Sequence, residues 1–339
     1  MRSELRESGR VQHRVSMADV AAAAGVSGQT VSRVVNGSPR VDPATRARVE
    51  AAMATLGYRM HRAARALRTG RTETIGLLVS TLATVGNSRM LQAIADAAAV
   101  RGYALTVVTF HGAEGVADGF ARLHDQGIDG AIILNEATAA SEGLSRPGGL
   151  ALVVVDASHP VTGDRVAAVQ TDHAAGARAA TDHLLARGGT VHHLAGPVGS
   201  FAAAERERGW RESLHAAGRA APPVLRGDWS AASGHAALVD ALAAGEPVTA
   251  LFAANDQMAL GALRALADAG RHVPEEVAVV GFDDIADAAQ YRPPLSTVRQ
   301  DFDRLGERAV ATLAALIAGE GGESILLAPQ FVARDSSAG

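Results

Sequence analysis

From Thr74 onward, short continuous apolar runs alternate with longer stretches of helical periodicity, and this alternation limits the possible fold more than any other feature of the chain. The runs include TIGLLVS, GAIIL, ALVVVD and VAVVGFDD. Strands that are buried on both faces have this composition, and their alternation with helices predicts parallel α/β sheets. The pattern restarts after Asp156, with VAAVQTD as the first strand of a second cycle, so we expect two similar Rossmann-like lobes.

Length and composition restrict the class of protein. The chain has 339 residues, more than one typical domain of about 100–200 residues, and 47% of them are hydrophobic. No apolar run reaches about 18 residues, and the polar start MRSELRESGRVQHR is unlike a secretory signal. The absence of cysteine excludes disulfides and thiolate chemistry. We therefore expect a cytoplasmic protein without a membrane segment.

The first fifth of the chain has the pattern of a helix-turn-helix. Ser16 is placed to cap a first helix with Asp19 as its capping-box partner, and Gly25 is suited to the tight turn that follows. Ser27 is placed to cap a second helix, and a third runs from about Asp42 to Leu56. The expected inner faces are apolar: Val20, Ala21, Ala24, Val31, Val34, Val35, Val49, Met53 and Leu56. The alternative is a helical hairpin that only packs.

The positive charge and the outward polar side chains of this N-terminal segment predict that it binds DNA. Residues 1–72 contain 13 arginines and 5 acidic residues, a net charge of +8, whereas the remainder carries −12. Arg33 is suited to chelating guanine and Gln29 to pairing with adenine in the major groove, while hydroxyl groups bind phosphates. The DNA-contact candidates within the helices are Ser16, Ser27, Gly28, Gln29, Thr30, Ser32, Arg33 and Asn36.

Polar residues directly follow several of the expected strands. They are Ser80 and Thr81, Asp156, Asp172, Asn255 and Asp256, and Asp283 and Asp284. Ligands of parallel α/β sheets bind beyond the carboxyl ends of the strands, so most of these side chains are expected to line a cleft. For Asp172, the alternative is a structural role instead of a place in the cleft. Asp284 is expected to cap the helix that follows it.

The stretch MADVAAAAGVSGQTVSRVVNG resembles the DNA-binding head of the lactose-repressor/galactose-repressor family of transcriptional regulators. The resemblance implies that Gly28 and Gln29 select the operator sequence. It also implies that HRAARALRTGR is a hinge helix which folds on operator DNA and inserts Leu67 into the minor groove, where an apolar wedge kinks the duplex. Tyr58 is followed by Arg59 rather than by the Pro-Asn pair usual in the family.

The body resembles the same family over nearly its whole length, most closely its lactose-repressor branch, in GDWSAASG, FAANDQMALGALRA, VAVVGFDD and PPLSTVRQDFDRLGE. The resemblance implies a two-lobed, type I periplasmic-binding-protein-like sensor. Its sugar-binding positions fall on Asp156, Arg206, Trp229, Asn255, Asp283, Gln300 and Phe302. The loop after the first strand, Val85-Gly86-Asn87 with Met90 one turn on, departs from that branch, so Asn87 and Met90 are expected to meet a different part of the ligand.

These features predict a domain order. A flexible arm covers residues 1–14, the helix-turn-helix 15–58, a hinge helix or linker 59–72, and the sensor 73–339. The first lobe is expected at about 73–170 and 302–328, and the second at about 171–300 and 329–335. No leucine heptads follow the last strand, so a homodimer is expected, with Met90, Ile94 and Tyr103 contributing to its interface.

The function that these expectations favour is a repressor bound to pseudo-palindromic operator DNA and released by a small sugar, with a galactoside favoured. The main alternative is a regulator activated by a co-repressor that is not a galactoside, such as a purine. A glycosidase using Asp156 and Asp283, and a transport-type sugar binder, are weaker alternatives because of the DNA-binding head. No phosphate-binding glycine motif is present, and the spacing of His173, His183, His192 and His193 fits no zinc pattern, so neither cofactor nor metal is expected.

Overall fold

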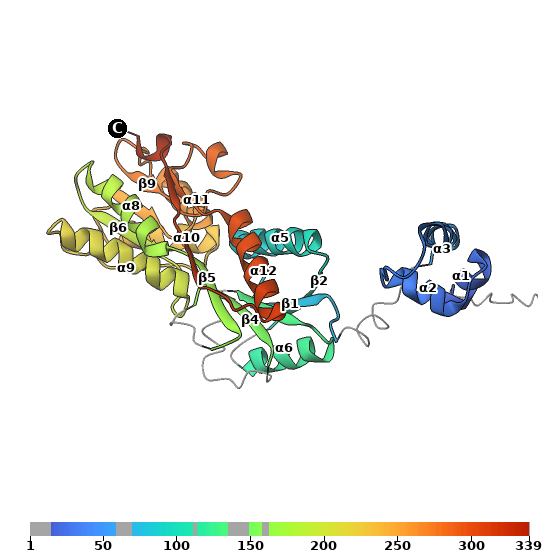
Figure 1. The fold of residues 1–339 in the computed structure, drawn as a ribbon. Helices are drawn as coiled ribbons and strands as arrows, with labels where there is room; N and C mark the ends of the chain where they lie inside the picture. Colours follow the sequence, from blue (N-terminus) through green and yellow to red (C-terminus); the bar gives the residue numbers. More distant parts are fainter. Residues whose placement is uncertain (1–14, 59–69, 111–113, 135–148, 158–162, 339) are drawn as a thin grey trace, which may run out of the picture. The chain divides into compact units, whose positions relative to one another are not determined.

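A computed structural model describes residues 15–58, 70–110, 114–134, 149–157 and 163–338. The chain divides into two compact units, Met1–Thr72 and Glu73–Gly339, whose elements are labelled in Figure 1. Each unit has its own core and is described separately below.

The first unit is a helix-turn-helix followed by a third helix. Its helices are α1 (Met17–Ala24), α2 (Gly28–Val35) and α3 (Pro43–Leu56). Ser16 and Asp19 form the expected capping box, Gly25 turns the chain with φ of 63°, and the Ser27 side chain caps α2. Glycine adopts this left-handed conformation without the steric cost of a Cβ. The caps and the turn predicted from the sequence are therefore confirmed.

A small apolar core holds these three helices together. Val20, Val31 and Val49 are fully buried, one from each helix, and Val34 is nearly so. Val35, Met53 and Leu56 pack against the core at its edge and are only partly buried. The polar side of α2 is left facing outward.

The first lobe of the second unit is a parallel sheet of six described strands, ordered β11-β5-β4-β3-β1-β2. Its strands are β1 (Thr74–Val79), β2 (Ala104–Thr109), β3 (Gly130–Leu134), β4 (Ala151–Val155), β5 (Val166–Thr171) and β11 (Ile325–Leu327). Helices α5 (Val85–Val100) and α12 (Phe302–Ala318) cover one face, and α6 (Glu114–Asp125) covers the other. Consecutive residues such as Ile132 and Ile133 enter opposite cores, which explains the continuous apolar runs.

The second lobe is a parallel sheet with the order β7-β6-β8-β9. These strands are β6 (Val191–Ala195), β7 (Leu225–Arg226), β8 (Ala250–Ala253) and β9 (Ala278–Val280). Helices α8 (His173–Leu185) and α9 (Phe201–Ala216) cover one face, while α10 (Ala231–Ala243) and α11 (Asp256–Asp268) cover the other. At the contact of α10 with α11, a Cβ on Gly261 would overlap the carbonyl oxygen of Ala231, so only glycine permits this packing.

The chain crosses between the lobes near residues 172, 301 and 328. Strand β10 (Thr297–Arg299) pairs antiparallel with β12 (Gln330–Val332), and between them α12 and β11 return to the first lobe. Two short 3-10 helices, η1 (Ala288–Gln290) and η2 (Asp335–Ser337), complete the second unit. Among the described residues, no helix combines the length and apolar character that crossing a bilayer requires.

Two expectations about the sheets and the core of the second unit were wrong. The run VAAVQTD does not open the second cycle: β5 pairs with β4 through Leu152 and Val166 and so belongs to the first sheet. Strand composition cannot show which sheet a strand joins, because both sheets need the same apolar residues. Met90 and Ile94 are 2% and 0% exposed and pack in the core, so they cannot face a partner subunit.

A buried histidine makes the stability of the second lobe depend on pH. His193 of β6 is fully buried, its ring stacks on Phe252 at 4.7 Å between centroids, and Nδ1–H donates to the Phe252 carbonyl. Burial lowers the pKa of His193 to about 4, from 6.5. The unfolded chain then binds more protons between these values, so stability is fully present above about pH 6.5 and is lost as pH falls toward 4.

We predict that the free energy of unfolding of the second unit falls by about 2 kcal/mol more between pH 7 and pH 5 in the wild type than in His193→Leu. Urea unfolding followed by tryptophan fluorescence measures this, because Trp210 and Trp229, the two tryptophans of the chain, both lie in that unit. If the free energy of unfolding depended on pH equally in the two proteins, the lowered pKa of His193 would not be the cause.

Candidate functional site

One cavity lies between the two lobes and collects the residues expected to bind ligand. It encloses about 550 Å³ of space, part of it open to solvent. All nine ligand-binding candidates line it: Asn87, Met90, Asp156, Arg206, Trp229, Asn255, Asp283, Gln300 and Phe302. Thr84, Gly86, Val155, Ser200, Ala202 and Leu305 complete the lining.

The parallel topology explains why residues so distant in sequence meet here. Asp156 follows β4, Asn255 follows β8 and Asp283 follows β9, so each lies at the carboxyl end of its strand. Helix α5 begins at the same edge, with Thr84 as its N-cap and Asn87 in its first turn. The predicted gathering of strand-end residues is therefore confirmed for these three only. The cavity lining does not include the other strand-end residues, which are Ser80, Thr81, Asp172, Asp256 and Asp284.

The backbone at three of these positions is strained. Asp156, Trp229 and Asp283 have φ of 61°, 76° and 111°, values that side chains other than glycine rarely adopt. Such conformations cost about 1–3 kcal/mol each and persist where the surrounding structure fixes them, most often at binding or catalytic sites. The strain therefore marks this cavity as a functional site independently of its polar lining.

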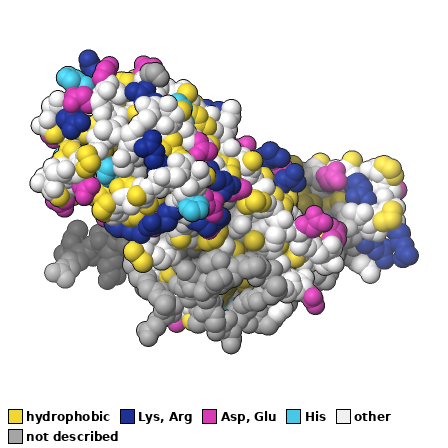
Figure 2. All heavy atoms as spheres, turned by 90° about the vertical axis from the view of Figure 1, so that its left-hand side faces the viewer, with side chains coloured by type: hydrophobic (Ala, Val, Ile, Leu, Met, Phe, Trp, Pro, Cys, Tyr) yellow, Lys and Arg dark blue, Asp and Glu magenta, His cyan; other side chains and the backbone are white. Residues whose placement is uncertain are grey.

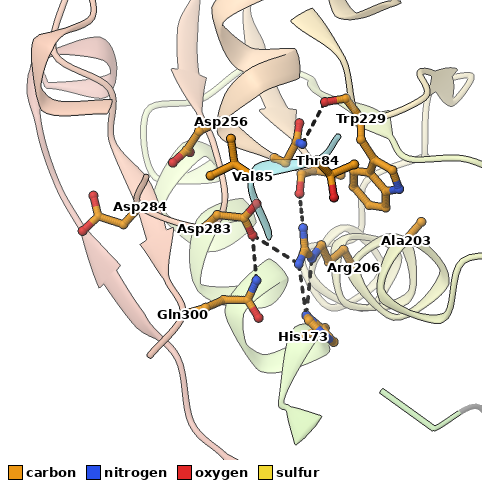
Figure 3. Close-up of polar contacts among 12 residues, drawn as sticks. Thr84, Val85, His173, Ala203, Arg206, Trp229, Asp256, Asp283, Asp284 and Gln300 are labelled. Atoms are coloured by element: carbon orange, nitrogen blue, oxygen red, sulfur yellow. Dashed lines mark hydrogen bonds and ion pairs between the residues drawn. The ribbon is translucent and has the colours of Figure 1, made fainter. Parts of the chain in front are cut away.

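Arg206 is the centre of the polar network at the base of the cavity (Figure 3). It extends from α9, is 4% exposed, and donates from Nη1 to the carbonyl oxygen of Ala254. Its Nη2 lies 3.4 Å from Oδ1 of Asp283, which also accepts a 2.7 Å hydrogen bond from Nε2 of Gln300. The guanidinium carbon lies 3.8 Å from the centre of the Phe282 ring.

Burial opposes the charges of this network. Removal from water lowers the pKa of Arg206, and the neighbouring Asp283 counters that change. Burial likewise raises the pKa of Asp283, against the effects of Arg206 and Gln300. Because each charged group has a hydrogen-bonded partner, the pair can remain ionised inside the protein. Two further carboxylates, Asp156 and Asp256, lie near enough to support the charge of Arg206.

His173 completes the network and was not among the predicted site residues. Its Nε2 lies 3.0 Å from Oδ1 of Asp156, and its Nδ1 lies 3.4 Å from Nε and 3.3 Å from Nη2 of Arg206. The histidine is buried behind the lining residues, against the rings of Phe201 and Phe282. In the sequence it was only one of several histidines, and nothing local distinguished it from a core residue.

Two aromatic side chains give the cavity its apolar faces. Phe302, the first residue of α12, is 7% exposed, and Trp229 is half-buried before α10. The Trp229 ring lies 5.6 Å from the guanidinium carbon of Arg206. Its position depends on Gly196, since a Cβ there would overlap the indole ring. Flat apolar faces beside hydrogen-bonding groups suit a ligand with both C–H and hydroxyl surfaces.

Several acidic and amide residues near the cavity have structural roles. Asn255 caps α11 and also donates to the carbonyl oxygen of Trp229, and Asp172 caps α8. Asp256 is fully buried with a pKa raised well above its usual range, primarily by burial and then by Asp283. The expectation that Asp284 caps a helix was wrong: it forms ion pairs with Arg299 and Arg334, because the chain after it runs into a loop rather than a helix.

On the outside of α9, arginine and acidic side chains form a separate surface network. Arg208 pairs with Glu205 and Glu212, and Arg211 pairs with Glu207. Figure 2 shows basic and acidic side chains intermixed over one face of the molecule. The segment ERERGWRE thus contains both surface arginines and the buried Arg206, which the helical period turns inward.

In the first unit, the DNA-contact candidates that the structure describes are all exposed or partly exposed. Gln29 and Arg33 are exposed and stand one helical turn apart on α2, so they share a face. Ser16, Ser27, Gly28 and Asn36 are also exposed, while Thr30 and Ser32 are partly so. Thr30 bonds to Ser27, and Ser32 accepts from Asn36. Leu67 lies outside the described residues.

A helix-turn-helix followed by a two-lobed α/β body with a polar cavity between its lobes defines a class of ligand-sensing DNA-binding regulators. Residues 16–60 match the family described as "Bacterial regulatory proteins, lacI family", and residues 181–337 match the family described as "Periplasmic binding protein-like domain". The chain belongs to the lacI family of bacterial regulatory proteins and is a DNA-binding transcriptional repressor with a sugar-binding sensor domain.

Characterised relatives cover nearly the whole chain. It is 38% identical over 316 residues to the lactose operon repressor of Escherichia coli K12, covering 90% of this chain and 86% of that protein. It is 36% identical over 337 residues to the HTH-type transcriptional regulator CelR of Thermobifida fusca, covering 93% and 96%. These relatives are transcriptional regulators rather than enzymes.

Solved structures agree. The lac repressor dimer bound to operator and the anti-inducer ONPF superposes with a TM-score of 0.85 at 34% identity, covering 96% of this chain and all of that one. A CelR–cellobiose complex gives a TM-score of 0.69 at 33% identity, covering 95% and 100%. The predicted fold, a helix-turn-helix head with an α/β sensor of two Rossmann-like lobes, is confirmed.

We predict that Gly196→Ala displaces Trp229 from the cavity wall, because the new methyl group would occupy the space of the indole. The emission of Trp229 is then expected to shift to longer wavelength as the ring becomes more exposed, while Trp210, fully buried elsewhere, contributes a constant background.

Gly86→Ala is the matched control. A Cβ at Gly86, in the same cavity, would meet Phe302 only at an ordinary contact distance of 4.0 Å. Its emission should therefore equal that of the wild type. An unchanged spectrum in Gly196→Ala would contradict the packing described here.

Proposed function

We propose that this protein is a homodimeric repressor that leaves its operator when a small neutral sugar binds between the lobes of its sensor. The observation that carries the proposal is the cavity: nine residues of ligand-binding type surround it, and their backbones are strained at three positions. The helix-turn-helix supplies the DNA-binding surface, with Arg33 and Gln29 reading bases from α2. Residues 59–72 are proposed as the hinge that carries Leu67 to the minor groove.

The chemistry of the cavity supports a sugar. The Oδ1 atoms of Asp156 and Asp283 accept hydrogen bonds from His173 and from Arg206 and Gln300, and hydroxyl groups of a ligand can donate to the remaining carboxylate oxygens. Trp229 and Phe302 can pack against the C–H face of a sugar ring. A site that hydrogen-bonds hydroxyls rejects analogues without them.

The charge of the lining supports a neutral ligand. Among the described lining residues, Arg206 is the single cation, and its donors already serve His173, Ala254 and Asp283. Two carboxylates face the same space, so an anionic sugar would meet repulsion that the guanidinium does not offset. A galactoside is the first choice by similarity to the lactose operon repressor, and the CelR–cellobiose complex makes a β-glucoside the second.

We predict that one of a galactoside or cellobiose, at about 100 times its Kd, stabilises the sensor by about 2.7 kcal/mol in a thermal-shift assay. Asp283→Asn should weaken that binding by about one to two orders of magnitude, because a hydrogen bond to a charged acceptor is lost. Asp287→Asn, an exposed position on the same segment, should bind as the wild type does. Stabilisation by a purine instead of any sugar would contradict the proposal.

We predict that saturating sugar lowers the affinity of the full-length protein for operator DNA by about 5–150-fold. The operator is a duplex that the protein selects from a randomised pool, and fluorescence anisotropy measures Kd with and without sugar. Arg33→Ala should lose operator selectivity and keep sugar affinity. If the sugar instead tightened operator binding, it would act as a co-repressor, and its proposed role as an inducer would be wrong.

A further inference from the structure

His173 lies where the chain passes from the first lobe to the second. It is the first residue of α8 and comes two residues after the last residue of β5, which belongs to the first sheet. The intervening Asp172 caps α8, and its backbone N–H donates to the carbonyl oxygen of Leu327 at the end of β11. The histidine is 2% exposed and is therefore fixed within this crossing rather than on a surface.

The partners of His173 determine which of its ring nitrogens donates and which accepts a hydrogen bond. A guanidinium can only donate hydrogen bonds, so Nδ1, which faces Nε and Nη2 of Arg206, must carry a lone pair. The proton is then on Nε2, where it is donated to Oδ1 of Asp156 over 3.0 Å. The Nε2–H tautomer is therefore the arrangement that satisfies both partners.

These two partners belong to different lobes and both line the cavity. Asp156 directly follows β4 of the first sheet, while Arg206 lies on α9 of the second lobe. Beyond Arg206 the hydrogen bonds continue to Asp283 and then to Gln300, beside the second crossing. His173 does not line the cavity itself, so it can respond to a ligand only through Asp156 and Arg206.

We propose that His173 is the positioning residue through which effector occupancy changes the angle between the lobes. Its Nδ1 acceptor holds Arg206 in the orientation that meets the ligand, and its Nε2 donor ties that arginine to Asp156 of the opposite lobe. A ligand that bonds to Asp156 and Arg206 competes with both hydrogen bonds and so loosens the link between the lobes beside the crossing at residues 171–173. This inference rests on the proposed effector function.

Two substitutions of His173 separate its contact with Arg206 from its contact with Asp156. The side-chain oxygen of asparagine reaches the place of Nδ1, so His173→Asn can still accept from Arg206 but cannot reach Asp156. The terminal amide of glutamine reaches the place of Nε2, so His173→Gln can donate to Asp156 but lacks the acceptor for Arg206. His183→Asn is the control, since His183 lies on the same helix and bonds to Ser337 away from the cavity.

The test uses full-length protein, o-nitrophenyl β-galactoside and cellobiose as probes, and the selected operator duplex. We expect His173→Asn to keep the sugar Kd within about threefold while the effect of saturating sugar on operator affinity falls from about 5–150-fold toward onefold. We expect His173→Gln to weaken sugar binding by about tenfold or more, yet to retain the operator response once saturated. His183→Asn should match the wild type in both measurements.

If His173 only stabilised the fold, its substitutions would lower the melting temperature but leave the sugar Kd and the operator response to saturating sugar unchanged. That result would overturn the role of His173. A parallel loss of sugar affinity and of the operator response in both variants would overturn it as well. A wild-type protein that responds to neither sugar would instead refute the proposed function, and this inference with it.

Discussion

The polar chain Asp156–His173–Arg206–Asp283 is the constraint on which the sensor depends. A guanidinium and two carboxylates are held almost without access to water, and removal of Arg206 would leave the carboxylates buried without a cation, at a cost of about 3–5 kcal/mol. The arrangement is tolerable because each group is hydrogen-bonded to the next. Since its members come from both lobes, the relative position of the lobes is part of what satisfies them.

The fold supplies this chain through its topology. Parallel strands direct their carboxyl ends to one edge of each sheet, so residues more than 100 positions apart, such as Asp156 and Asp283, meet in one cavity. The backbone bends into left-handed conformations there, which the packed sheets on either side impose. Because residues of both lobes line the cavity, its shape depends on the angle between the lobes.

Much of this was predictable from sequence. The caps at Ser16 and Ser27, the turn at Gly25 and the strand-end placement of Asp283 follow from local chemistry and from strand composition. The sheet to which β5 belongs and the ion pairs of Asp284 were not predictable, because pairing partners are set by tertiary contacts. His173 was missed for the same reason: its importance comes from two neighbours that are distant in sequence, Asp156 and Arg206.

Linkage between effector and operator binding is reciprocal: each ligand weakens the binding of the other by the same factor. Calorimetric titration of the sugar into the protein alone, and then into its operator complex, measures this linkage. We expect operator to raise the sugar Kd by the same factor by which sugar raises the operator Kd. Equal sugar Kd values in the presence and absence of operator would contradict it.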